Sequence, residues 1–323
     1  MVIYNYQIVR RNSLMKSKII AVFLSVSVLS LCMSSGSALA DTSGSEGFQE
    51  YVMYNINLVT GEEGYESIPI SDDDFLEENI SDIIPENNND TGISPNAYIG
   101  EDDSYEILDT YNMPYKAVCN LKTYWDTDGD GETDLISGGS GCIIGRRVLI
   151  TAGHVIYNKS RGGKCKGVKV YPAQQRYYTP YTYNATNLYV NADYYENPKT
   201  EDDWGLIILD DYAGDITGWL ELRNCSSYNM LGENVSVIGY PGGKDKDRKT
   251  MWRSDGKIVE EFTETLRYDC DTTGGCSGGP VIDANDNIVA IHSGGTTNKS
   301  NVGAKVDDFM CRVADVLVRM YNH

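Results

Sequence analysis

A glycine-rich loop at residues 271–280, Asp-Thr-Thr-Gly-Gly-Cys-Ser-Gly-Gly-Pro, is the stretch of the chain best suited to nucleophilic chemistry. A serine hydroxyl is a weak nucleophile at neutral pH, so a reactive serine needs open backbone and N–H donors aimed at the developing oxyanion. Glycines on both sides of Ser277 provide this, because Gly275 lets its own amide and that of Ser277 converge on one point. A solvated hairpin is the alternative, since glycine clusters usually mark turns.

A base for this hydroxyl must come from the three histidines of the chain, His154, His292 and His323. His154 follows an apolar run at 148–150 and a small-residue turn, which would hold an imidazole at the end of a sheet. His323 is the last residue, where we expect fraying. His154 is therefore the predicted general base.

The third member of such a constellation is a carboxylate behind the imidazole, which fixes the tautomer and stabilises the imidazolium. Asp203 stands directly before an apolar run at 204–209 that predicts a buried strand, so it is better placed to point inward than Asp202. Taken alone, Asp203 would be interpreted as an ordinary strand-end carboxylate. Together with a base and a nucleophile, it completes a predicted catalytic triad of His154, Asp203 and Ser277.

The letters Gly275-x-Ser277-x-Gly279 also fit the nucleophile elbow of α/β-hydrolases, in which Asp and His follow the serine. Only 46 residues remain after Ser277, and they hold no series of strands and helices to carry such partners, so we reject the elbow. The chain order His, Asp, Ser instead resembles the chymotrypsin-like serine proteases. Thr-Ala-Gly-His at 151–154 and Gly-Cys-Ser-Gly-Gly-Pro at 275–280 agree with that resemblance.

Within that clan, the chain most resembles the bacterial glutamyl endopeptidases, over roughly residues 97 to 320. The segments that carry the resemblance are 97–103, 114–117, 237–242, 268–280 and 291–295. The resemblance implies the triad above and an oxyanion hole formed by the amides of Gly275 and Ser277. It also implies a glutamate pocket that involves Thr272 and His292, reached by a mature N-terminus at Ala97.

The domain at 97–323 shows short apolar or alternating runs separated by Gly, Asn, Asp and Pro turns, which favours an all-β sandwich or barrel. Apolar residues recur at helical spacing between 306 and 320, which predicts a C-terminal amphipathic helix. The resemblance implies two chymotrypsin-like antiparallel β-barrels, the first at about 97–212 and the second, with the helix, at about 213–323. His154 and Asp203 would come from the first barrel and Ser277 from the second.

The first forty residues have the pattern of a secretory signal peptide. They contain no acidic residue and four basic ones, followed by an apolar run at 19–31 and Ala-Leu-Ala at 38–40. The apolar run is too short to span a membrane. We therefore predict a signal peptide at 1–40, with Met15 as an alternative start, and a secreted, extracellular protein without a membrane anchor after signal removal.

Residues 41–96 carry fourteen Asp or Glu and no Lys or Arg. Such a segment is expected to be solvated and self-repelling. It is either a disordered acidic linker or a propeptide, and we favour an acidic propeptide because the resemblance begins only at Ala97. The domain that follows keeps 33 acidic and 23 basic side chains, so we expect protein or peptide substrates, no nucleic-acid partner and a monomer.

A second cluster of possible ligands lies at 126–134, Asp-Thr-Asp-Gly-Asp-Gly-Glu-Thr-Asp. Oxygen ligands at alternate positions with glycine at the sixth are typical of a calcium loop, but position twelve is Ser137 in place of a bidentate carboxylate. A structural calcium site and an acidic hairpin tip both stay open. The candidate ligands are Asp126, Asp128, Asp130, Glu132 and Asp134. We expect no cofactor for catalysis.

Seven cysteines follow the signal peptide, and an odd count leaves at least one thiol unpaired within the chain. The resemblance adds two departures. Val155 stands where some relatives have a cysteine bridged back to the position of Cys142. Cys276 precedes the serine where relatives often carry an amide side chain.

These observations predict a serine endopeptidase that cuts after acidic residues, above all Glu. Two alternatives stay open. Asp271, six residues before the serine, could attract Lys or Arg in a trypsin-like pocket, whereas the imidazole of His292 favours an anionic side chain. A catalytically inactive relative that binds ligands is the other alternative, and the intact His, Asp and Ser argue against it.

Overall fold

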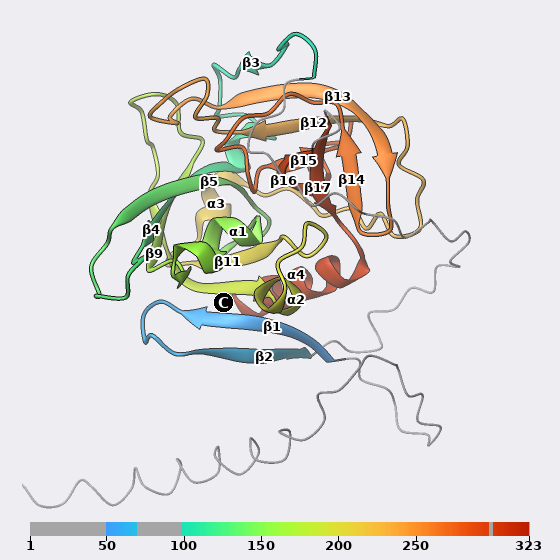
Figure 1. Cartoon of the computed structure of the whole chain (residues 1–323). Helices are drawn as coiled ribbons and strands as arrows, with labels where there is room; N and C mark the ends of the chain where they lie inside the picture. Colours follow the sequence, from blue (N-terminus) through green and yellow to red (C-terminus); the bar gives the residue numbers. More distant parts are fainter. Residues whose placement is uncertain (1–49, 70–98, 297–299, 323) are drawn as a thin grey trace, which may run out of the picture. The chain divides into compact units, whose positions relative to one another are not determined.

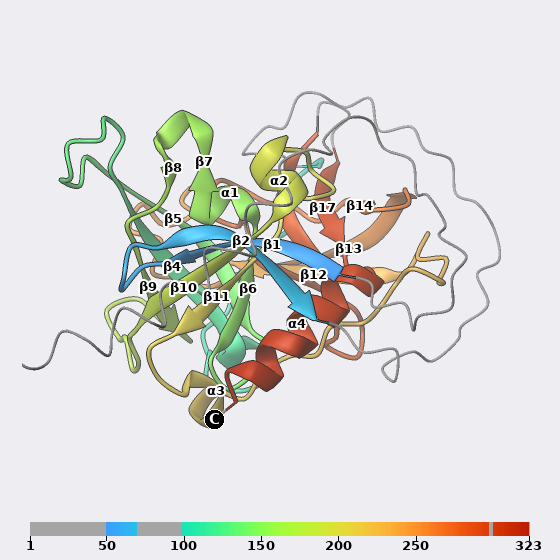
Figure 2. The same cartoon turned by 90° about the horizontal axis from the view of Figure 1, so that it is seen from below.

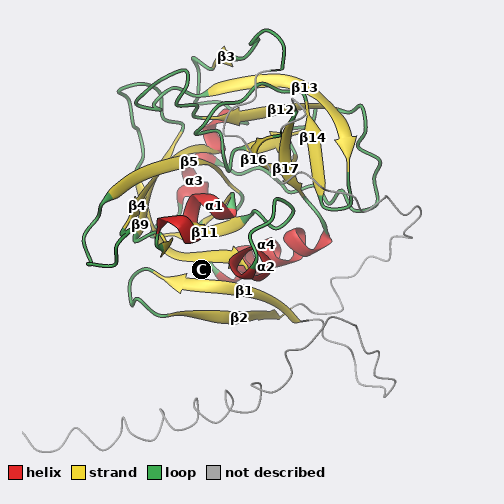
Figure 3. Cartoon of the chain, viewed as in Figure 1, coloured by secondary structure: helices red, strands yellow, loops and turns green. Residues whose placement is uncertain are grey.

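The computed structural model describes residues 50–69, 99–296 and 300–322. The predicted signal peptide, most of the acidic segment, Ala97 and His323 lie outside the described residues. Strands predominate in the described part of the chain (Figure 3). None of its helices is long and apolar enough to cross a membrane.

The first barrel carries the His154 and Asp203 end of the predicted site. Its sheet runs in the order β11-β6-β5-β4-β9-β10, and β10 also pairs with β11, which closes the barrel. The strands are β4 (Val118–Trp125), β5 (Leu135–Ile143), β6 (Val148–Thr151), β9 (Gly167–Pro172), β10 (Tyr183–Asn191) and β11 (Gly205–Leu209). All five residues of β11 are buried, as expected for an apolar run in a barrel core.

The second barrel carries the loop with Ser277. Its sheet runs in the order β12-β15-β16-β17-β14-β13, and β12 pairs again with β13. The strands are β12 (Asn234–Gly239), β13 (Trp252–Glu261), β14 (Thr265–Tyr268), β15 (Pro280–Ile282), β16 (Ile288–Gly295) and β17 (Asn301–Lys305). A short strand β3 (Tyr105–Glu106) adds to the edge of β13. The all-β prediction of two antiparallel barrels with a C-terminal helix is confirmed (Figure 1).

The C-terminal helix α4 (Asp308–Met320) ends where its pattern predicted and begins two residues later than the first residue of that pattern, Val306. The side chain of its N-cap, Asp307, accepts a hydrogen bond from the Met310 amide at 2.7 Å, which satisfies an N–H without a partner in the helix. Phe309 packs edge-on against Trp204 with ring centroids 5.4 Å apart. The helix therefore packs on the first barrel, although it follows the second in the sequence.

Short elements occupy the connections between strands. They are β7 (Tyr157–Asn158), β8 (Gly163–Lys164), α1 (Gly153–Ile156), α2 (Ala192–Glu196), α3 (Ala213–Thr217) and the 3₁₀ turns at Tyr115–Ala117 and Lys159–Arg161. The seven cysteines that follow the predicted signal peptide are all free thiols in the structure.

One element departs from the sequence-based expectation. Residues 50–69, within the acidic segment, form a hairpin of β1 (Glu50–Asn57) and β2 (Glu63–Pro69). β1 pairs with β10 antiparallel from Met53 opposite Asn191 to Asn57 opposite Asn187, and the hairpin lies beside the first barrel in both views (Figures 1 and 2). The expectation of a solvated segment is wrong for these residues, because Met53, Ile56 and Ile68 are buried in the core. Glu66, opposite Met53, is half-buried and accepts from Asn55 Nδ2 at 2.5 Å.

Candidate active site

The loop between β14 and β15 presents Ser277 in a backbone conformation that needs glycine. Gly275 has φ of 108°, and a Cβ there would lie 2.5 Å from the Tyr240 carbonyl oxygen. Gly278 has φ of 81°, and a Cβ there would lie 2.1 Å from Thr151 Oγ1. Because both conditions exclude a side chain, these glycines fix the path of the loop around Ser277.

Two amides of the same loop have no hydrogen-bond partner among the described residues. The Gly274 carbonyl accepts from the Gly242 amide at 2.7 Å, and the Cys276 carbonyl accepts from the Gly279 amide at 2.8 Å. In a trans peptide the C=O and the following N–H point in opposite directions, so the N–H groups of Gly275 and Ser277 point away from these contacts. Within the described residues no hydrogen bond uses either N–H, which leaves both able to donate to an oxyanion.

The structure brings His154 and Asp203 into direct contact. His154 lies in α1, immediately after β6, and Asp203 precedes β11, the neighbour of β6 in the barrel. The Asp203 carboxylate accepts from the His154 amide at 2.8 Å and lies 2.7 Å from its Nδ1. Only 3% of Asp203 is exposed, so the ion pair is shielded from water on the carboxylate side. The placement matches the predicted pair, whereas Asp202 does not contact the imidazole within the described residues.

Two opposing influences act on the imidazole of His154. Burial lowers its pKa, but the charge of Asp203 and the hydrogen bond to it outweigh burial, so the pKa lies above its ordinary value of 6.5. The carboxylate on Nδ1 also sets the tautomer, because a neutral ring that donates from Nδ1 keeps Nε2 as the acceptor. This is the state that a general base requires.

Ser277 lies on the same cleft as His154. Residues of both barrels line this cleft of about 790 Å³, including His154, Gly138, Gly275 and Ser277. The Ser277 hydroxyl is 3.3 Å from the Ser293 carbonyl oxygen, its one hydrogen-bond partner among the described residues. A rotation of the hydroxyl toward His154 would accompany substrate binding, as is common when a site without ligand tightens around its substrate.

His292, on β16, is only 1% exposed. Burial, followed by the charge of His154, lowers its pKa to about 3, with Asp203 acting in the opposite direction, so the imidazole is neutral at neutral pH. Its Nδ1 lies 2.7 Å from the Tyr268 hydroxyl. Burial raises the pKa of Tyr268 well above its usual value, so the phenol keeps its proton and is able to donate it to Nδ1. In the tautomer that accepts this hydrogen bond, the neutral His292 ring carries its proton on Nε2 and can donate it.

Thr272 is buried beside this histidine's strand and is held by a residue that sequence reasoning did not single out. Its Oγ1 donates to Asn301 Oδ1 at 2.7 Å, and Asn301 Nδ2 donates to the Cys270 carbonyl at 2.5 Å. Asn301 and Tyr268 are the two missed residues. A buried polar residue at the end of each of two adjacent apolar strands was their only signal in the sequence.

Asp271 does not lie free at the base of a pocket. It is 5% exposed, and its two oxygens accept from the Ile99 amide at 2.6 Å and the Asp103 amide at 3.1 Å. The start of the described catalytic domain is thus fastened to the residue next to Thr272. Ala97, the predicted N-terminus, lies outside the described residues.

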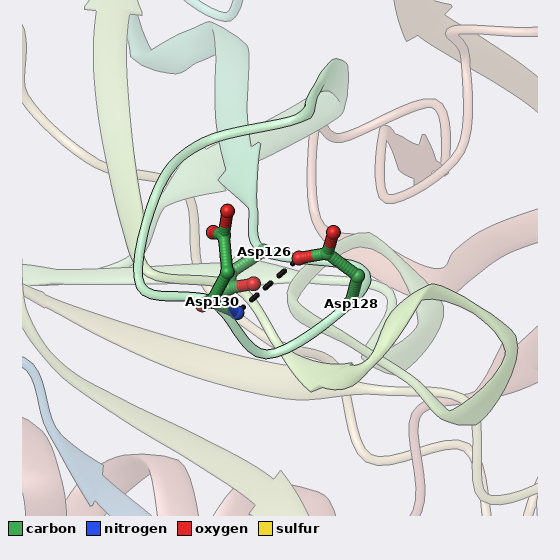
Figure 4. A group of neighbouring side chains, drawn as sticks. All are labelled: Asp126, Asp128 and Asp130. Carbon is green, nitrogen blue, oxygen red and sulfur yellow. Dashed lines mark hydrogen bonds between the residues drawn. The ribbon is translucent and has the colours of Figure 1, made fainter.

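The acidic loop at 126–134 brings three of the five candidate calcium ligands together. One carboxylate oxygen from each of Asp126, Asp128 and Asp130 lies within 4.8 Å of the others (Figure 4). Glu132 and Asp134 are not in this group, and Asp134 Oδ2 accepts from the Thr127 amide at 2.7 Å. The Lys166 ammonium lies 3.9 Å from Asp126 Oδ2. The structure therefore brings together part of the candidate ligand set, next to the positive charge of the Lys166 side chain.

Comparisons with known proteins place the chain in a family. The trypsin-like peptidase domain matches residues 139–291. An extracellular metalloprotease of Bacillus subtilis is 30% identical over 219 residues, 66% of this chain and 67% of that protein. A glutamyl endopeptidase of Bacillus licheniformis is 28% identical over 211 residues, 63% of this chain and 62% of that protein. The chain thus spans about two thirds of the length of these relatives.

A solved structure agrees with these sequence matches. The structure of a Glu endopeptidase in complex with MPD is 26% identical, with a TM-score of 0.59. The match covers 70% of this chain and 99% of that one. The chain belongs to the trypsin-like peptidases and is a trypsin-like serine peptidase related to the glutamyl endopeptidases.

Proposed function

We propose that the protein is a secreted serine endopeptidase that hydrolyses peptide bonds after acidic residues, mainly Glu. The observation that carries this proposal is the 2.7 Å contact between His154 Nδ1 and Asp203 Oδ2. His154 lines the same cleft as Ser277, beside two amides that have no hydrogen-bond partner among the described residues. Glutamyl endopeptidases among the relatives support the preference for Glu. The signal-like pattern of residues 1–40 and a relative named as extracellular support secretion.

The proposed reaction uses these groups in turn. Ser277 Oγ attacks the substrate carbonyl carbon while His154 Nε2 takes the hydroxyl proton, and Asp203 stabilises the imidazolium that forms. The amides of Gly275 and Ser277 donate to the oxyanion. His154 then returns the proton to the leaving amine, and an acyl-enzyme on Ser277 remains. Water, deprotonated by the same imidazole, hydrolyses this ester and restores the serine.

Selection of glutamate rests on donors in a buried pocket. A carboxylate loses several kcal/mol on leaving water unless the pocket supplies partners. In this proposal the Tyr268 hydroxyl donates to Nδ1 of His292, so the imidazole offers a proton on Nε2. Thr272 offers a hydroxyl that now donates to Asn301. Because both groups are neutral, they supply hydrogen bonds and no positive charge.

The missing charge is supplied, in this proposal, by the amine that cleavage before Ala97 would create. The Ile99 amide is bonded to Asp271, the neighbour of Thr272. Two further residues reach about 7 Å along an extended chain, so an amine at Ala97 lies within reach of the pocket. Cys276 cannot pair with this amine, because burial raises the pKa of its thiol to about 11 and keeps it neutral. The uncleaved precursor is then a zymogen that is weak toward Glu.

The alternatives are less well supported by the same site. Asp271 uses both oxygens to accept main-chain amides and is buried, which disfavours a trypsin-like preference for Lys or Arg. The name of the Bacillus subtilis relative raises metal-dependent hydrolysis. Among the described residues, however, the one group of possible metal ligands is the three aspartates of the 126–134 loop, none of which lines the Ser277 cleft.

A peptide-library cleavage profile tests the proposal. The mature enzyme should cleave after Glu far faster than after Gln, with Lys and Arg disfavoured. N-terminal sequencing of the active protein should place its start at or within a few residues of Ala97. Predominant cleavage after Lys or Arg would support the trypsin-like alternative. Absence of cleavage would support a catalytically inactive protein that binds ligands.

A further inference from the structure

The cleft beside Ser277 is strongly basic in a chain whose formal net charge is −20. Five of its lining residues are cationic, and one is acidic. The cationic residues are Lys122, Arg161, Lys246, Arg248 and Lys249. The acid, Asp247, is paired with the Lys249 ammonium at 3.1 Å, which leaves an excess of positive charge next to the nucleophile.

Arg248 is the most constrained of these cations. Its backbone has φ of 50°, a left-handed conformation that is costly for a residue with a Cβ. Its side chain runs past Gly275 into a space left by Gly138, where a Cβ would lie 2.0 Å from the guanidinium. The backbone conformation of Arg248 and the space beside Gly138 and Gly275 together position this guanidinium in the cleft.

The guanidinium of Arg248 is held without a counter-charge. Nη2 donates to the Leu121 carbonyl at 3.2 Å, whereas Nη1 is buried and has no hydrogen-bond partner in the described residues. Among the described residues, burial and the Cys276 thiol are the influences on the pKa of Arg248, and no carboxylate is among them. Arg248 as a whole is half-buried, and a half-buried cation without a counter-charge favours an anion in the cleft, which supplies both charge and acceptors.

The cleft lies on the side of Ser277 that receives the leaving group. It includes His154, which gives its proton to the leaving amine, and Gly275 of the oxyanion site. It does not include Thr272, His292 or Ser293, which lie on the side of the proposed glutamate pocket. Substrate residues after the cleaved bond must therefore pass along the basic wall.

We propose that this cleft binds carboxylates of the substrate on the leaving-group side, and that Arg248 is a specificity-determining residue for them. The preferred substrates carry Asp or Glu within the first few residues after the cleaved bond. The proposal rests on the proposed serine peptidase function and extends it from one acidic residue to an acidic stretch. Lys246 and Lys249 at the rim add long-range attraction that salt screens.

Quenched fluorescent peptides with a fixed Glu before the cleaved bond test this directly. One series places Asp, Asn or Lys at each of the three positions after the bond, and all peptides end in an amide so that no terminal carboxylate competes. In the wild type, kcat/KM for the best Asp peptide should exceed that of its Asn partner roughly tenfold or more, as for a hydrogen bond to a charged group. A matching series with free C-termini shows whether a terminal carboxylate is accepted in place of the side chain.

The variants Arg248→Gln, Arg248→Lys and Lys246→Gln should lower the Asp to Asn ratio, with Arg248→Gln lowering it most and Arg248→Lys retaining part of it. A merely structural Arg248 would lower kcat/KM for both peptides equally and leave the ratio unchanged. Lys257→Gln removes an exposed charge on β13, outside the cleft, and should leave the ratio at its wild-type value. A wild-type ratio near one, or a ratio that Arg248→Gln and Lys246→Gln both leave intact, overturns the proposal.

The result can be separated from the choice of residue before the bond. Peptides with Gln in place of Glu before the cleaved bond, in otherwise identical sequences, measure the glutamate pocket alone. If Glu shows no advantage over Gln while the Asp to Asn ratio holds, the proposed pocket fails and the basic cleft stands. The reverse result removes the cleft and leaves the pocket.

A separate observation concerns the β1–β2 hairpin, whose contacts with the barrel are those of a structural element. Tyr54 stacks on Tyr195 with ring centroids 3.6 Å apart, and Tyr51 stacks on Phe309 of α4 at 4.8 Å. At its turn, the Leu58 amide donates to the Thr186 carbonyl at 2.8 Å. Removing the hairpin would unpair the β10 edge and expose the apolar surface that covers Met53, Ile56 and Ile68.

We infer that residues 50–69 stay bound to the protease domain after the chain is cleaved ahead of Ala97. Strand pairing and buried side chains act without the covalent link, as when an added strand completes a sheet edge. The mature protein then consists of two polypeptides, and the surface of β10 and α4 is the interface that holds them. This inference is independent of the specificity of the site.

A recognition sequence for a site-specific protease, inserted between residues 80 and 90 of the Ser277→Ala protein, tests this inference. After complete cutting, size exclusion and denaturing mass spectrometry should find both fragments together in equimolar amounts. Met53→Asp should release the hairpin fragment, whereas Val59→Asp, at a turn residue that is 76% exposed, should not. Separation of the fragments in the cut parent protein, with an unchanged melting temperature of the larger one, contradicts the inference.

Discussion

His154 and His292 are two histidines of one active-site region with opposite electrostatics. His154, in the first barrel, faces the buried carboxylate of Asp203, which raises the pKa of the imidazole despite burial. His292, in the second barrel, faces a phenol, and burial lowers its pKa to about 3. The first imidazole can accept and hold a proton during a reaction, whereas the second stays neutral.

The difference shows that the partner on Nδ1 decides what a buried histidine can do. A carboxylate on Nδ1 stabilises the charged ring and leaves Nε2 as a base. A hydroxyl that donates to Nδ1 stabilises the neutral ring and forces the proton onto Nε2, where it can bind an anion. The same side chain is thus suited to proton transfer in one barrel and to recognition in the other.

The largest effect is predicted for substitutions of the reacting groups, Ser277 and His154. Ser277→Ala and His154→Ala should each lower kcat by roughly 10⁴ to 10⁶, because triad members act as a unit. Both variants should keep the circular dichroism spectrum of the parent, and Ser277→Ala should also keep its melting temperature, whereas His154→Ala leaves the buried Asp203 carboxylate unpaired and should melt earlier. If Ser277→Ala retained more than a few per cent of activity, measured on a Glu peptide, the nucleophile would be another residue.

A smaller and more selective effect is expected at His292. Loss of one donor to a charged group costs about 1.5–3 kcal/mol, so His292→Val should lower kcat/KM on Glu peptides by roughly 10- to 100-fold. The matched Gln peptides should be much less affected, because no buried carboxylate loses its partner. Tyr268→Phe keeps the imidazole and removes only the group that fixes its tautomer, so its selectivity loss should be smaller. Equal losses on Glu and Gln peptides would make His292 a structural residue.

The pH dependence of the reaction separates the two imidazoles again. Only neutral His154 can take the serine proton, so kcat/KM should fall as pH decreases through its pKa, with the midpoint above 6.5 because that pKa is raised. His292, with a pKa of about 3, should add no step near neutrality. Asp203→Asn should move the midpoint to lower pH and cut kcat by about 10⁴. If Asp203→Asn left the midpoint unchanged, the fall of kcat/KM at low pH would belong to a group other than His154.

Calcium should raise the thermal stability of the protein without changing catalysis by His154 or glutamate selection by His292. If Asp126, Asp128 and Asp130 bind the ion, the melting temperature should rise with free calcium, by roughly 5–10 °C at about 100 times Kd. Asp128→Asn should reduce the rise without changing the Glu to Gln ratio. Differential scanning fluorimetry with calcium and with EDTA measures it, and identical curves would remove the metal site.

Much of the site could be predicted from local sequence because its parts are short motifs. The glycines around Ser277 are required by two positive φ angles and two near contacts, so they stand out in the chain. Asp203 could be preferred over Asp202 because the run after it is buried on both faces. The helix at 308–320 followed from its apolar spacing.

The remainder depended on contacts between distant parts of the chain. Residues 50–69 are acidic in composition, and only their pairing with β10 shows that Met53, Ile56 and Ile68 are buried. The role of Asp271 depends on the amides of Ile99 and Asp103, more than 160 residues earlier. The neutral state of His292 depends on its burial and on the charge of His154, which belongs to the other barrel.

Labelling by a fluorophosphonate, which reacts with activated serines without a glutamate side chain, tests the central claim most directly. Mass spectrometry of the labelled wild type should locate the adduct on Ser277, and His154→Ala should suppress the labelling rate by several orders of magnitude. The His292→Val variant should be labelled far faster than the His154→Ala variant, because the imidazole of His292 takes no part in proton transfer. An adduct on another residue, or equal suppression by the two histidine variants, would contradict the account.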